Sequence, residues 1–419
     1  MKNIALKIIY KILAFYARIV VAKYNPTVIA ITGTVGKTST KEAIFQVLSD
    51  AFPGKVRRSF GNLNAEIGIP LSILGYDSLP NKFLWPIFLV SASRRINQKN
   101  YPAYLILEMG VEKKGDLKYF ASIVKPKYLI VTAVGLAHLS NFSDLSEYQN
   151  EKLSILDEVT AQGKILLNYD DPILQKISND KIISVAGKNL LADYHAEDIK
   201  LTTKGTEFRI CRSGRKIAIK SHLLGEHLIN SSVFAFALAD ILNVSLLQVG
   251  KSLEKLAQYP GRMNIISGSR ETTIIDDSYN ANPASVKAAL IALSQIVYKE
   301  RKVLILGNMN ELGDLEKKYH EEIGAFALNR CDFAIFVGPN AKTMQKGYGD
   351  KKTSIIFNNR QDLIDHLSPL IKSGDLILVK ASQNGNYFEE VVKSLMQNPD
   401  KADKLLVRQS KFWLRKKHI

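Results

Sequence analysis

Cysteine is scarce in this chain, whose 419 residues include only Cys211 and Cys331. The two lie far apart and have none of the spacings typical of metal-binding motifs, so we expect no disulfide framework and a reducing, cytoplasmic environment. Also missing is an uninterrupted run of about 20 apolar residues, the length that a membrane-spanning helix needs. We find no internal repeat and no low-complexity linker. Because 46% of the residues are hydrophobic, the sequence predicts a globular protein of more than one domain.

Acidic residues are missing from residues 1–25, which carry five Lys or Arg, and residues 401–419 carry seven Lys or Arg against one Asp. The two ends therefore hold most of the net charge of +17, and the body of the chain is only mildly basic. Basic ends favour an anionic surface, either a membrane or a polyanion. A nucleic-acid-binding ATPase would fit the total charge, but helicase-type motifs are missing. We therefore predict no nucleic-acid partner.

Residues 1–24 are rich in aliphatic and aromatic side chains, and Lys7, Lys11 and Arg18 fall on one face of a predicted helix. No small-residue cleavage site follows this segment. Our preferred interpretation is an amphipathic helix that lies on the inner face of the membrane. The alternative is a helix that packs its apolar face on the domain. The apolar residues 83–90 leave the same two interpretations open, and there we favour a packed helix.

The most informative segment is residues 29–41, Ile-Ala-Ile-Thr-Gly-Thr-Val-Gly-Lys-Thr-Ser-Thr-Lys. A β-branched run, a glycine loop and a helical pattern follow one another, which is the order that cradles a triphosphate. The loop is a shortened form, because Ile31 stands where the usual phosphate loop carries glycine. Lys37 can reach the outer phosphates, and the Thr38 hydroxyl can ligate Mg²⁺. The residues predicted to contact the nucleotide are Gly33, Thr34, Val35, Gly36, Lys37, Thr38 and Ser39.

Beyond this loop, short β-rich runs alternate with helical patterns, which predicts an α/β fold with a mostly parallel sheet. Residues 183–222 differ, because their short alternating strands indicate a small antiparallel addition. Pro260 and Gly261 mark a boundary, and a second α/β pattern follows it. The predicted domains are a basic amphipathic helix (1–25), a central ATP-binding domain (26–260) and a Rossmann-like C-terminal domain with a basic tail (261–419).

Three further residues in the first domain could serve chemistry. Glu108 ends a predicted strand beside the glycine loop, where a carboxylate can hold Mg²⁺ opposite Thr38. The alternative is an exposed acid at a strand end. His138 follows the next strand, and a lone histidine is more often structural than catalytic. Lys152, predicted at the start of a helix, is by composition an ordinary surface lysine.

In the second domain, residues 276–283 read Asp-Asp-Ser-Tyr-Asn-Ala-Asn-Pro. They end a predicted strand and precede a helix, which is where a ligand crevice forms in an α/β sheet. The amides of Asn280 and Asn282 could contact an adenine or a ribose, and Asp277 could accept a hydrogen bond from a sugar hydroxyl. The alternative is a helix N-cap and turn, which the same residue types favour.

Together these motifs resemble the Mur ligases, the ATP-dependent amide-forming enzymes of peptidoglycan assembly, over about residues 28–395. The segment 276–283 is typical of the MurF-like branch, which adds D-alanyl-D-alanine to UDP-N-acetylmuramoyl-tripeptide. The other matching motifs are the glycine loop, Gly61-Asn-Leu-Asn-Ala-Glu-Ile-Gly-Ile-Pro70, Glu108-Met-Gly110, Ala137-His-Leu139, Pro260-Gly-Arg262 and Leu306-Gly-Asn-Met-Asn-Glu-Leu-Gly313 with His320.

This resemblance implies ATP and Mg²⁺ as cofactors and an acyl-phosphate intermediate that the amine of a dipeptide attacks. It also implies a cytoplasmic enzyme with small-molecule substrates, a muropeptide and a dipeptide, and we expect a monomer. Lys152 would become a carbamate with CO₂, because an ammonium cannot ligate Mg²⁺. The implied catalytic residues are Lys37, Glu108, His138 and Lys152, and the implied metal ligands are Thr38, Glu108, His138 and Lys152. The residues implied to face the substrate are Asn62 and Asn64. Those implied to contact the nucleotide, besides the glycine loop, are Asn230, Arg262, Asp277, Tyr279, Asn280 and Asn282.

Three departures from the family pattern bear on the substrate. About 25 residues precede the first strand, so we expect the usual N-terminal UDP-binding domain to be lacking. Glu112 and Lys113 stand where the family has Asn-His, and Gln383 stands where it has arginine. The acceptor is therefore a muramoyl-tripeptide precursor, a lipid-linked muropeptide or a different carboxylate. A non-catalytic nucleotide-binding module is the remaining alternative.

Overall fold

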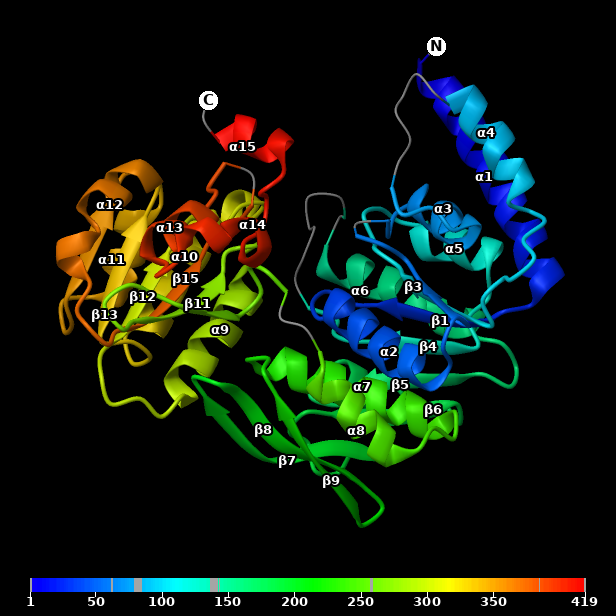
Figure 1. Ribbon diagram of the computed structural model, residues 1–419, viewed down its shortest axis with the longest axis horizontal. Helices are drawn as coiled ribbons and strands as arrows, with labels where there is room; N and C mark the ends of the chain where they lie inside the picture. The colour runs from blue at the N-terminus through cyan, green and yellow to red at the C-terminus, as the bar shows by residue number, and fades with distance from the viewer. Residues whose placement is uncertain are drawn as a thin grey trace. The chain divides into compact units, whose positions relative to one another are not determined.

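The computed structural model describes residues 2–417 apart from residues 62, 79–84, 136–141, 143, 257–258 and 384 (Figure 1). The chain divides into two compact units, which are described separately below. The first comprises residues 1–197, 209–219 and 227–255, and the second comprises residues 198–208, 220–226 and 256–419.

The larger sheet, most of whose residues belong to the first unit, has its strands side by side in the order β2, β3, β1, β4, β5, β6, β7, β8 and β9. The pairs from β2 to β7 are parallel, whereas β7, β8 and β9 are joined by tight turns that require antiparallel neighbours. The mostly parallel sheet with an antiparallel addition is thus confirmed. The strand bounds are β1 (Thr27–Thr32), β2 (Val56–Arg58), β3 (Tyr104–Glu108), β4 (Tyr128–Val131), β5 (Lys164–Asn168), β6 (Ile182–Ala186), β7 (Tyr194–Thr202), β8 (Gly205–Arg212) and β9 (Arg215–Ser221).

Helices cover this sheet, and β1 lies near its middle with residues 28–32 buried. Strands buried on both faces read as continuous apolar runs, which is why the sequence pattern located β1 and the strand β3 that ends at Glu108. The helices are α1 (Lys2–Tyr24), α2 (Lys37–Ala51), α3 (Gly68–Leu74), α4 (Trp85–Arg94), α5 (Asp116–Ile123), α6 (Leu145–Leu153), α7 (Glu226–Ile241) and α8 (Leu246–Glu254).

The N-terminal helix α1 packs on the first unit. Leu13, Ala17 and Val20 are fully buried in its core, and α1 contacts α3, α4 and α5. The buried face of α1 therefore packs on the domain, which was the alternative interpretation of this segment. Helix α4 also packs on the protein, because it contacts α1 (Figure 1). Among the helices that the structure describes, none is both long enough and apolar enough to cross a bilayer.

The second unit holds a sheet in the order β10, β11, β15, β12, β13, β14. Only β10 pairs antiparallel, and the other pairs are parallel. Alternate residues of β12 point to opposite faces, so Leu304 and Leu306 enter one core cluster while Val303 and Ile305 enter the other. The sheet thus has a core cluster on each face, and the predicted second α/β pattern is confirmed.

The strands of the second unit are β10 (Asn264–Ser267), β11 (Thr273–Asp277), β12 (Lys302–Leu306), β13 (Phe333–Val337), β14 (Ser354–Phe357) and β15 (Leu376–Lys380). Its helices are α9 (Pro283–Gln295), α10 (Glu316–Ala327), α11 (Ala341–Tyr348), α12 (Arg360–His366), α13 (Glu389–Leu395), α14 (Ala402–Leu405) and α15 (Lys411–Lys417).

Candidate active site

The glycine loop joins the end of β1 to the start of α2. Gly33 and Gly36 have φ angles of 144° and 84°, which L-residues with a side chain rarely adopt. A Cβ atom on Gly33 would lie 2.1 Å from Thr132 Oγ1. The Thr132 hydroxyl also donates to the Val35 carbonyl at 2.6 Å. The apolar run at residues 128–134 predicts a strand of that length, but β4 ends at Val131, where Thr132 turns toward this loop.

Lys37 begins α2 and folds back over the loop. Its Nζ donates to the Gly33 carbonyl at 2.7 Å and lies 3.4 Å from the Thr34 carbonyl oxygen. The first backbone N–H groups of α2 have no partner within the helix, and the helix dipole adds partial positive charge there. The loop therefore offers an ammonium and the backbone N–H groups of a helix N-terminus, which together fit an anionic phosphate chain.

Glu108 lies at the end of β3, directly beside β1. Its Oε1 accepts hydrogen bonds from Thr38 Oγ1 and Asn64 Nδ2, each at 3.2 Å, and its Oε2 lies 3.1 Å from Lys41 Nζ. Burial alone would raise the pKa of this carboxyl, but the charges of Lys41 and Lys37 lower it below its usual value. Glu108 is therefore an ionised carboxylate next to the Thr38 hydroxyl, a donor set that suits Mg²⁺.

Lys41 is a site residue that the sequence reasoning missed. Its side chain is 1% exposed, and it lies between Glu108 and Glu42, the latter at 3.6 Å. The sequence contained one signal for this role, which is that Lys41 follows Lys37 by four residues. Residues four apart share one face of a helix, so Lys41 lies on the same face of α2 as Lys37. A lysine on a helix is usually exposed, so this signal was weak.

Lys152 is placed in the last turn of α6, and the prediction that it starts a helix is wrong. Asp144 caps this helix by accepting from the Glu147 N–H at 2.8 Å, so the helix begins at Leu145, seven residues before Lys152. The lysine is also not a surface residue, because it is only 1% exposed. Its Nζ donates to the Gly33 carbonyl at 3.2 Å and lies 4.8 Å from the centre of the Tyr148 ring.

The surroundings of Lys152 disfavour a charged amine. Burial and then the nearby charge of Lys37 lower its pKa well below 10.5, and the opposite charge of Glu151 offsets this only in part. The Glu151 carboxylate is held by the backbone N–H groups of Gly115 and Leu117 at 2.9 and 3.0 Å. A neutral amine beside the phosphate loop can react as a nucleophile, whereas an ammonium cannot.

The remaining predicted site residues of the first unit are His138, Asn62 and Asn230. His138 and Asn62 lie outside the described residues. Asn230, on α7, has a buried side-chain oxygen with no hydrogen-bond partner among the described residues. The backbone approaches it closely, since a Cβ on Gly187 would lie 1.9 Å from this oxygen. An unsatisfied buried oxygen of this kind needs an explanation, and a ligand donor would provide one.

In the second unit, the two acids at the end of β11 have different roles. Asp276 is fully buried and accepts from the backbone N–H groups of Gly261 and Ser278 at 3.0 and 3.1 Å. Burial raises the pKa of Asp276 to about 6. Asp277 instead pairs with Lys380, whose Nζ lies 2.5 Å from Asp277 Oδ2. These contacts fix the loop that follows the strand.

The loop residues are also held by the chain itself. Asn282 caps α9 and accepts from the Ser285 N–H at 2.8 Å, so the N-cap alternative describes this residue. Asn280 Oδ1 accepts from the Gln383 N–H at 3.2 Å. The Tyr279 ring lies 4.3 Å from the Arg262 guanidinium. Tyr279 and Arg262 are thus in cation–π contact.

Two of the departures noted in the sequence also have defined places. The backbone N–H groups of Glu112 and Lys113 both donate to Asp116 at 2.9 Å, and the Lys113 side chain pairs with Glu66 at 3.0 Å. Gln383 accepts from Asn310 through its carbonyl at 2.8 Å. Main-chain hydrogen bonds therefore hold both positions in their loops, and such bonds do not require a particular side chain.

Comparison with known proteins identifies the family. The model of the Mur ligase middle domain matches residues 31–239, and that of the Mur ligase, glutamate ligase domain, matches residues 261–383. The chain belongs to the Mur ligase family. Both units of this Mur ligase carry a match, and the resemblance inferred from the motifs is confirmed.

Two similar proteins from different bacteria carry the same name. The UDP-N-acetylmuramoyl-tripeptide--D-alanyl-D-alanine ligase of Bacillus subtilis (strain 168) is 28% identical over 376 residues, which are 89% of this chain and 76% of the relative. The enzyme of the same name from Escherichia coli (strain K12) is 28% identical over 378 residues, which are 88% of this chain and 77% of the relative.

Solved structures agree with these relatives. MurF from Acinetobacter baumannii matches with a TM-score of 0.77 and 26% identity, covering 93% of this chain and 80% of that one. The MurF ligase of Thermotoga maritima in complex with ADP matches with a TM-score of 0.76 and 25% identity, covering 94% and 84%. The chain is thus a MurF-like Mur ligase.

Proposed function

We propose that this Mur ligase uses ATP to join D-alanyl-D-alanine to the terminal carboxylate of UDP-N-acetylmuramoyl-tripeptide. ATP, the carboxylate and the amine would give an amide, ADP, phosphate and a proton, by way of an acyl phosphate. The observation that carries the proposal is the arrangement around the glycine loop. Lys37, the Thr38–Glu108 pair and the buried Lys152 converge there, and a protein that only bound nucleotide would not need all of them.

Each of these residues has a distinct task in the proposed reaction. The loop N–H groups would orient the phosphates, and Lys37 would stabilise the charge that develops on the transferred phosphoryl group. Thr38 and Glu108 would hold Mg²⁺, together with His138 as the resemblance implies. Bound Mg²⁺ would neutralise part of the phosphate charge. Asn64 donates to Glu108, so it would orient this carboxylate and, with Asn62, border the acceptor.

Further nucleotide contacts are proposed in each unit by itself. In the second unit, Arg262 and Tyr279 would contact the adenine, and Asp277, Asn280 and Asn282 would shape the loop beside them; in the first unit, Asn230 would contact the nucleotide. The proposed domain limits remain residues 1–25, 26–260 and 261–419, and we propose a monomer. The contacts that support the loop assignment are those of Asp277 with Lys380 and of Asn280 with Gln383.

The proposed function is tested by incubating the purified protein with ATP, Mg²⁺, UDP-N-acetylmuramoyl-tripeptide and D-alanyl-D-alanine. We expect ADP release that requires both the tripeptide and the dipeptide. If ADP appears only with another carboxylate, the acceptor assignment is wrong. If no combination releases ADP above background although the protein binds ATP, the non-catalytic alternative holds.

We further propose that Lys152 carries a carbamate, formed when its neutral amine attacks CO₂ and releases a proton. The carbamate would supply an anionic oxygen pair for Mg²⁺ beside Glu108. With ¹³C-labelled bicarbonate, we expect a carbamate carbon resonance near pH 8 that weakens as the pH falls through the lowered pKa of Lys152, because a protonated amine cannot react. The Lys152→Met variant should lose both the resonance and the ligase activity.

The control for this experiment is Lys125→Met, since Lys125 is a surface lysine with a side chain that is 66% exposed. It should keep both the resonance and the activity. A resonance that survives in Lys152→Met would place the carbamate elsewhere. Wild-type protein that is active but shows no carbamate in CO₂-equilibrated buffer would exclude this modification.

We propose, in addition, a peripheral contact with the inner face of the membrane through α1, α4 and the basic tail. Although one face of α1 is buried, Ile8 and Phe15 of α1 are 53% and 55% exposed, and Ile87 and Val90 of α4 are 70% and 56% exposed. The two helices contact each other (Figure 1). Apolar side chains beside exposed lysines of α1 suit an anionic bilayer surface.

Substitutions test this contact better than a deletion, because removing α1 would uncover the buried residues of its other face. In sedimentation with vesicles that contain an anionic phospholipid, we expect Phe15→Ser with Ile87→Ser to reduce binding several-fold relative to wild type. The control is Leu191→Ser, because Leu191 is 92% exposed on a different segment. Equal sedimentation of all three proteins would argue against the contact.

A further inference from the structure

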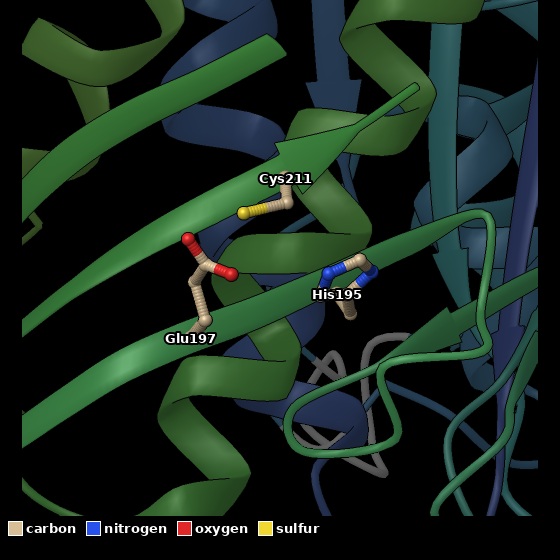
Figure 2. Close-up of side chains that lie close together, drawn as sticks. All are labelled: His195, Glu197 and Cys211. Carbon is tan, nitrogen blue, oxygen red and sulfur yellow. The ribbon is translucent and has the colours of Figure 1, made fainter. Parts of the chain in front are cut away.

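Three side chains that the ligase chemistry does not use lie together on the antiparallel addition of the first unit. His195 and Glu197 belong to β7 and Cys211 belongs to β8 (Figure 2). A ring nitrogen of His195, a carboxylate oxygen of Glu197 and Cys211 Sγ all lie within 4.8 Å of one another. Nitrogen, oxygen and sulfur donors of these three types are the ligands that Zn²⁺ takes in proteins.

The strand geometry explains how the three meet. Residues two apart on a strand point to the same face, so His195 and Glu197 share a face while Tyr194 and Ala196 are buried on the other. Cys211 lies on the neighbouring strand and completes a triangle across it. The strands are fixed by the sheet, so the donors are held near one another without help from a ligand.

The three groups are also in suitable chemical states. His195 Nδ1 lies 3.1 Å from the Ala192 carbonyl oxygen, which favours the tautomer protonated on Nδ1 and leaves a lone pair on Nε2. Histidines that bind metals are commonly fixed in this way by a backbone carbonyl. The Glu197 carboxylate is paired with Lys216, and Cys211 is a further hydrogen-bond partner, so its oxygens already lie among the other two donors.

We propose that His195, Glu197 and Cys211 form a binding site for Zn²⁺ or a similar transition-metal ion, with water as the fourth ligand. On binding, the Cys211 thiol releases its proton to solvent and its sulfur forms the bond to the metal. One thiolate, one carboxylate and a neutral imidazole then balance the charge of a divalent ion. Ligand atoms around tetrahedral Zn²⁺ lie roughly 3.5 Å apart, so side-chain rotations that draw the three donors slightly closer suffice.

One neighbouring cation competes with the metal. Lys216 Nζ lies 2.5 Å from Glu197 Oε1, and the Lys216 side chain is 51% exposed. The ammonium can therefore move into solvent when the carboxylate turns to a metal ion. The site would fasten β7 to β8 and would bind a metal only when Cys211 is reduced, since an oxidised sulfur is a poor ligand.

Cobalt is the probe that reports this site separately from the proposed ligase site. A Co²⁺–thiolate bond gives a charge-transfer absorption in the near ultraviolet, whereas a Mg²⁺ site built from Thr38 and Glu108 has no sulfur. We would titrate the full-length protein with Co²⁺ in excess Mg²⁺ and a phosphine reductant, and then displace Co²⁺ with Zn²⁺. We expect the absorption to saturate at a single equivalent and to disappear when Zn²⁺ is added.

Variants identify the ligands. Cys211→Ser should lose the absorption, and His195→Gln should weaken Co²⁺ affinity by about 100-fold or more. Lys216→Met should bind a few-fold more tightly, because it removes the competitor. The matched control is Cys331→Ser, which changes the other cysteine, buried in the second unit, and should leave the titration unchanged.

Several results would overturn the proposal. These are no charge-transfer absorption in the reduced wild type, an absorption that persists in Cys211→Ser, or one that is lost in Cys331→Ser. Circular dichroism of each variant shows whether the fold is retained, and His195→Gln, at a partly exposed residue, provides the test if Cys211→Ser does not fold. Ligase activity is measured in parallel, so loss of the proposed function and loss of the metal site are distinguishable.

Discussion

Lys37→Met is expected to lower kcat for ADP release by roughly 10²–10³-fold, the size of effect seen when one donor to a developing oxyanion is removed. Lys37 Nζ lies over the glycine loop, 2.7 Å from the Gly33 carbonyl oxygen, and methionine keeps the length of the side chain but not its charge. The measurement is steady-state ADP release with saturating ATP and both peptide substrates. A variant with full turnover would remove Lys37 from the catalytic residues.

The same substitution has a second expected effect. The charge of Lys37 contributes to the lowered pKa of Lys152, so its removal should raise that pKa and shift the loss of the carbamate resonance to higher pH. Lys125→Met is again the matched control, since it removes one positive charge from the surface of the same unit. A change of turnover without a change in the pH dependence of the resonance would show that the two lysines act independently.

The sequence predicted the parts of the fold that depend on local pattern. Strands β1 and β3 carry continuous apolar runs, and the positive φ angles of the phosphate loop require its glycines. The sequence therefore predicted both these strands and the loop. The boundary errors have local physical causes as well. The Asp144 cap moved the start of α6, and Thr132 turned toward the phosphate loop, which ended β4 early.

What the sequence could not predict depends on partners that are distant along the chain. Lys41 and Lys152 look like surface lysines until the strand that ends in Glu108 and the carbonyl of Gly33 are placed beside them. The apolar face of α1 could equally have faced lipid, because nothing local reveals α3 and α4 as its neighbours. Cys211 has no metal-binding spacing in sequence, and its proposed co-ligands lie on the adjacent strand.

The second large effect is expected at the buried pair of Glu108 and Lys41. Glu108→Ala should lower the free energy of unfolding of the first unit by about 3 kcal/mol, because breaking a buried ion pair leaves an uncompensated charge. The estimate is at the lower end for such pairs, because Glu42 remains 3.6 Å from Lys41. The same variant should lose ligase activity, since it removes a proposed Mg²⁺ ligand. Urea denaturation followed by circular dichroism measures the first effect, and ADP release measures the second.

A double variant separates these two consequences. Glu108→Gln combined with Lys41→Met removes both charges while nearly keeping the side-chain volumes, and replacing a buried pair in this way is often neutral or stabilising. We therefore expect its denaturation midpoint to return close to that of the wild type, while activity stays absent. Recovery of activity along with stability would mean that Glu108 serves the fold and not the metal.

The pH dependence of this stability difference has a definite sign. The pKa of Glu108 is lowered by folding from its ordinary value of 4.5, so near and below that pH the unfolded chain binds more protons than the folded chain does. Stability from the pair is therefore fully present above about pH 4.5 and is lost as the pH falls through the lower, folded-state pKa. The stability gap between wild type and the Glu108→Ala variant should accordingly be constant from pH 8 to pH 6 and should narrow in acid. A gap that widened in acid would show that Glu108 is protonated in the folded protein and cannot act as the proposed ligand.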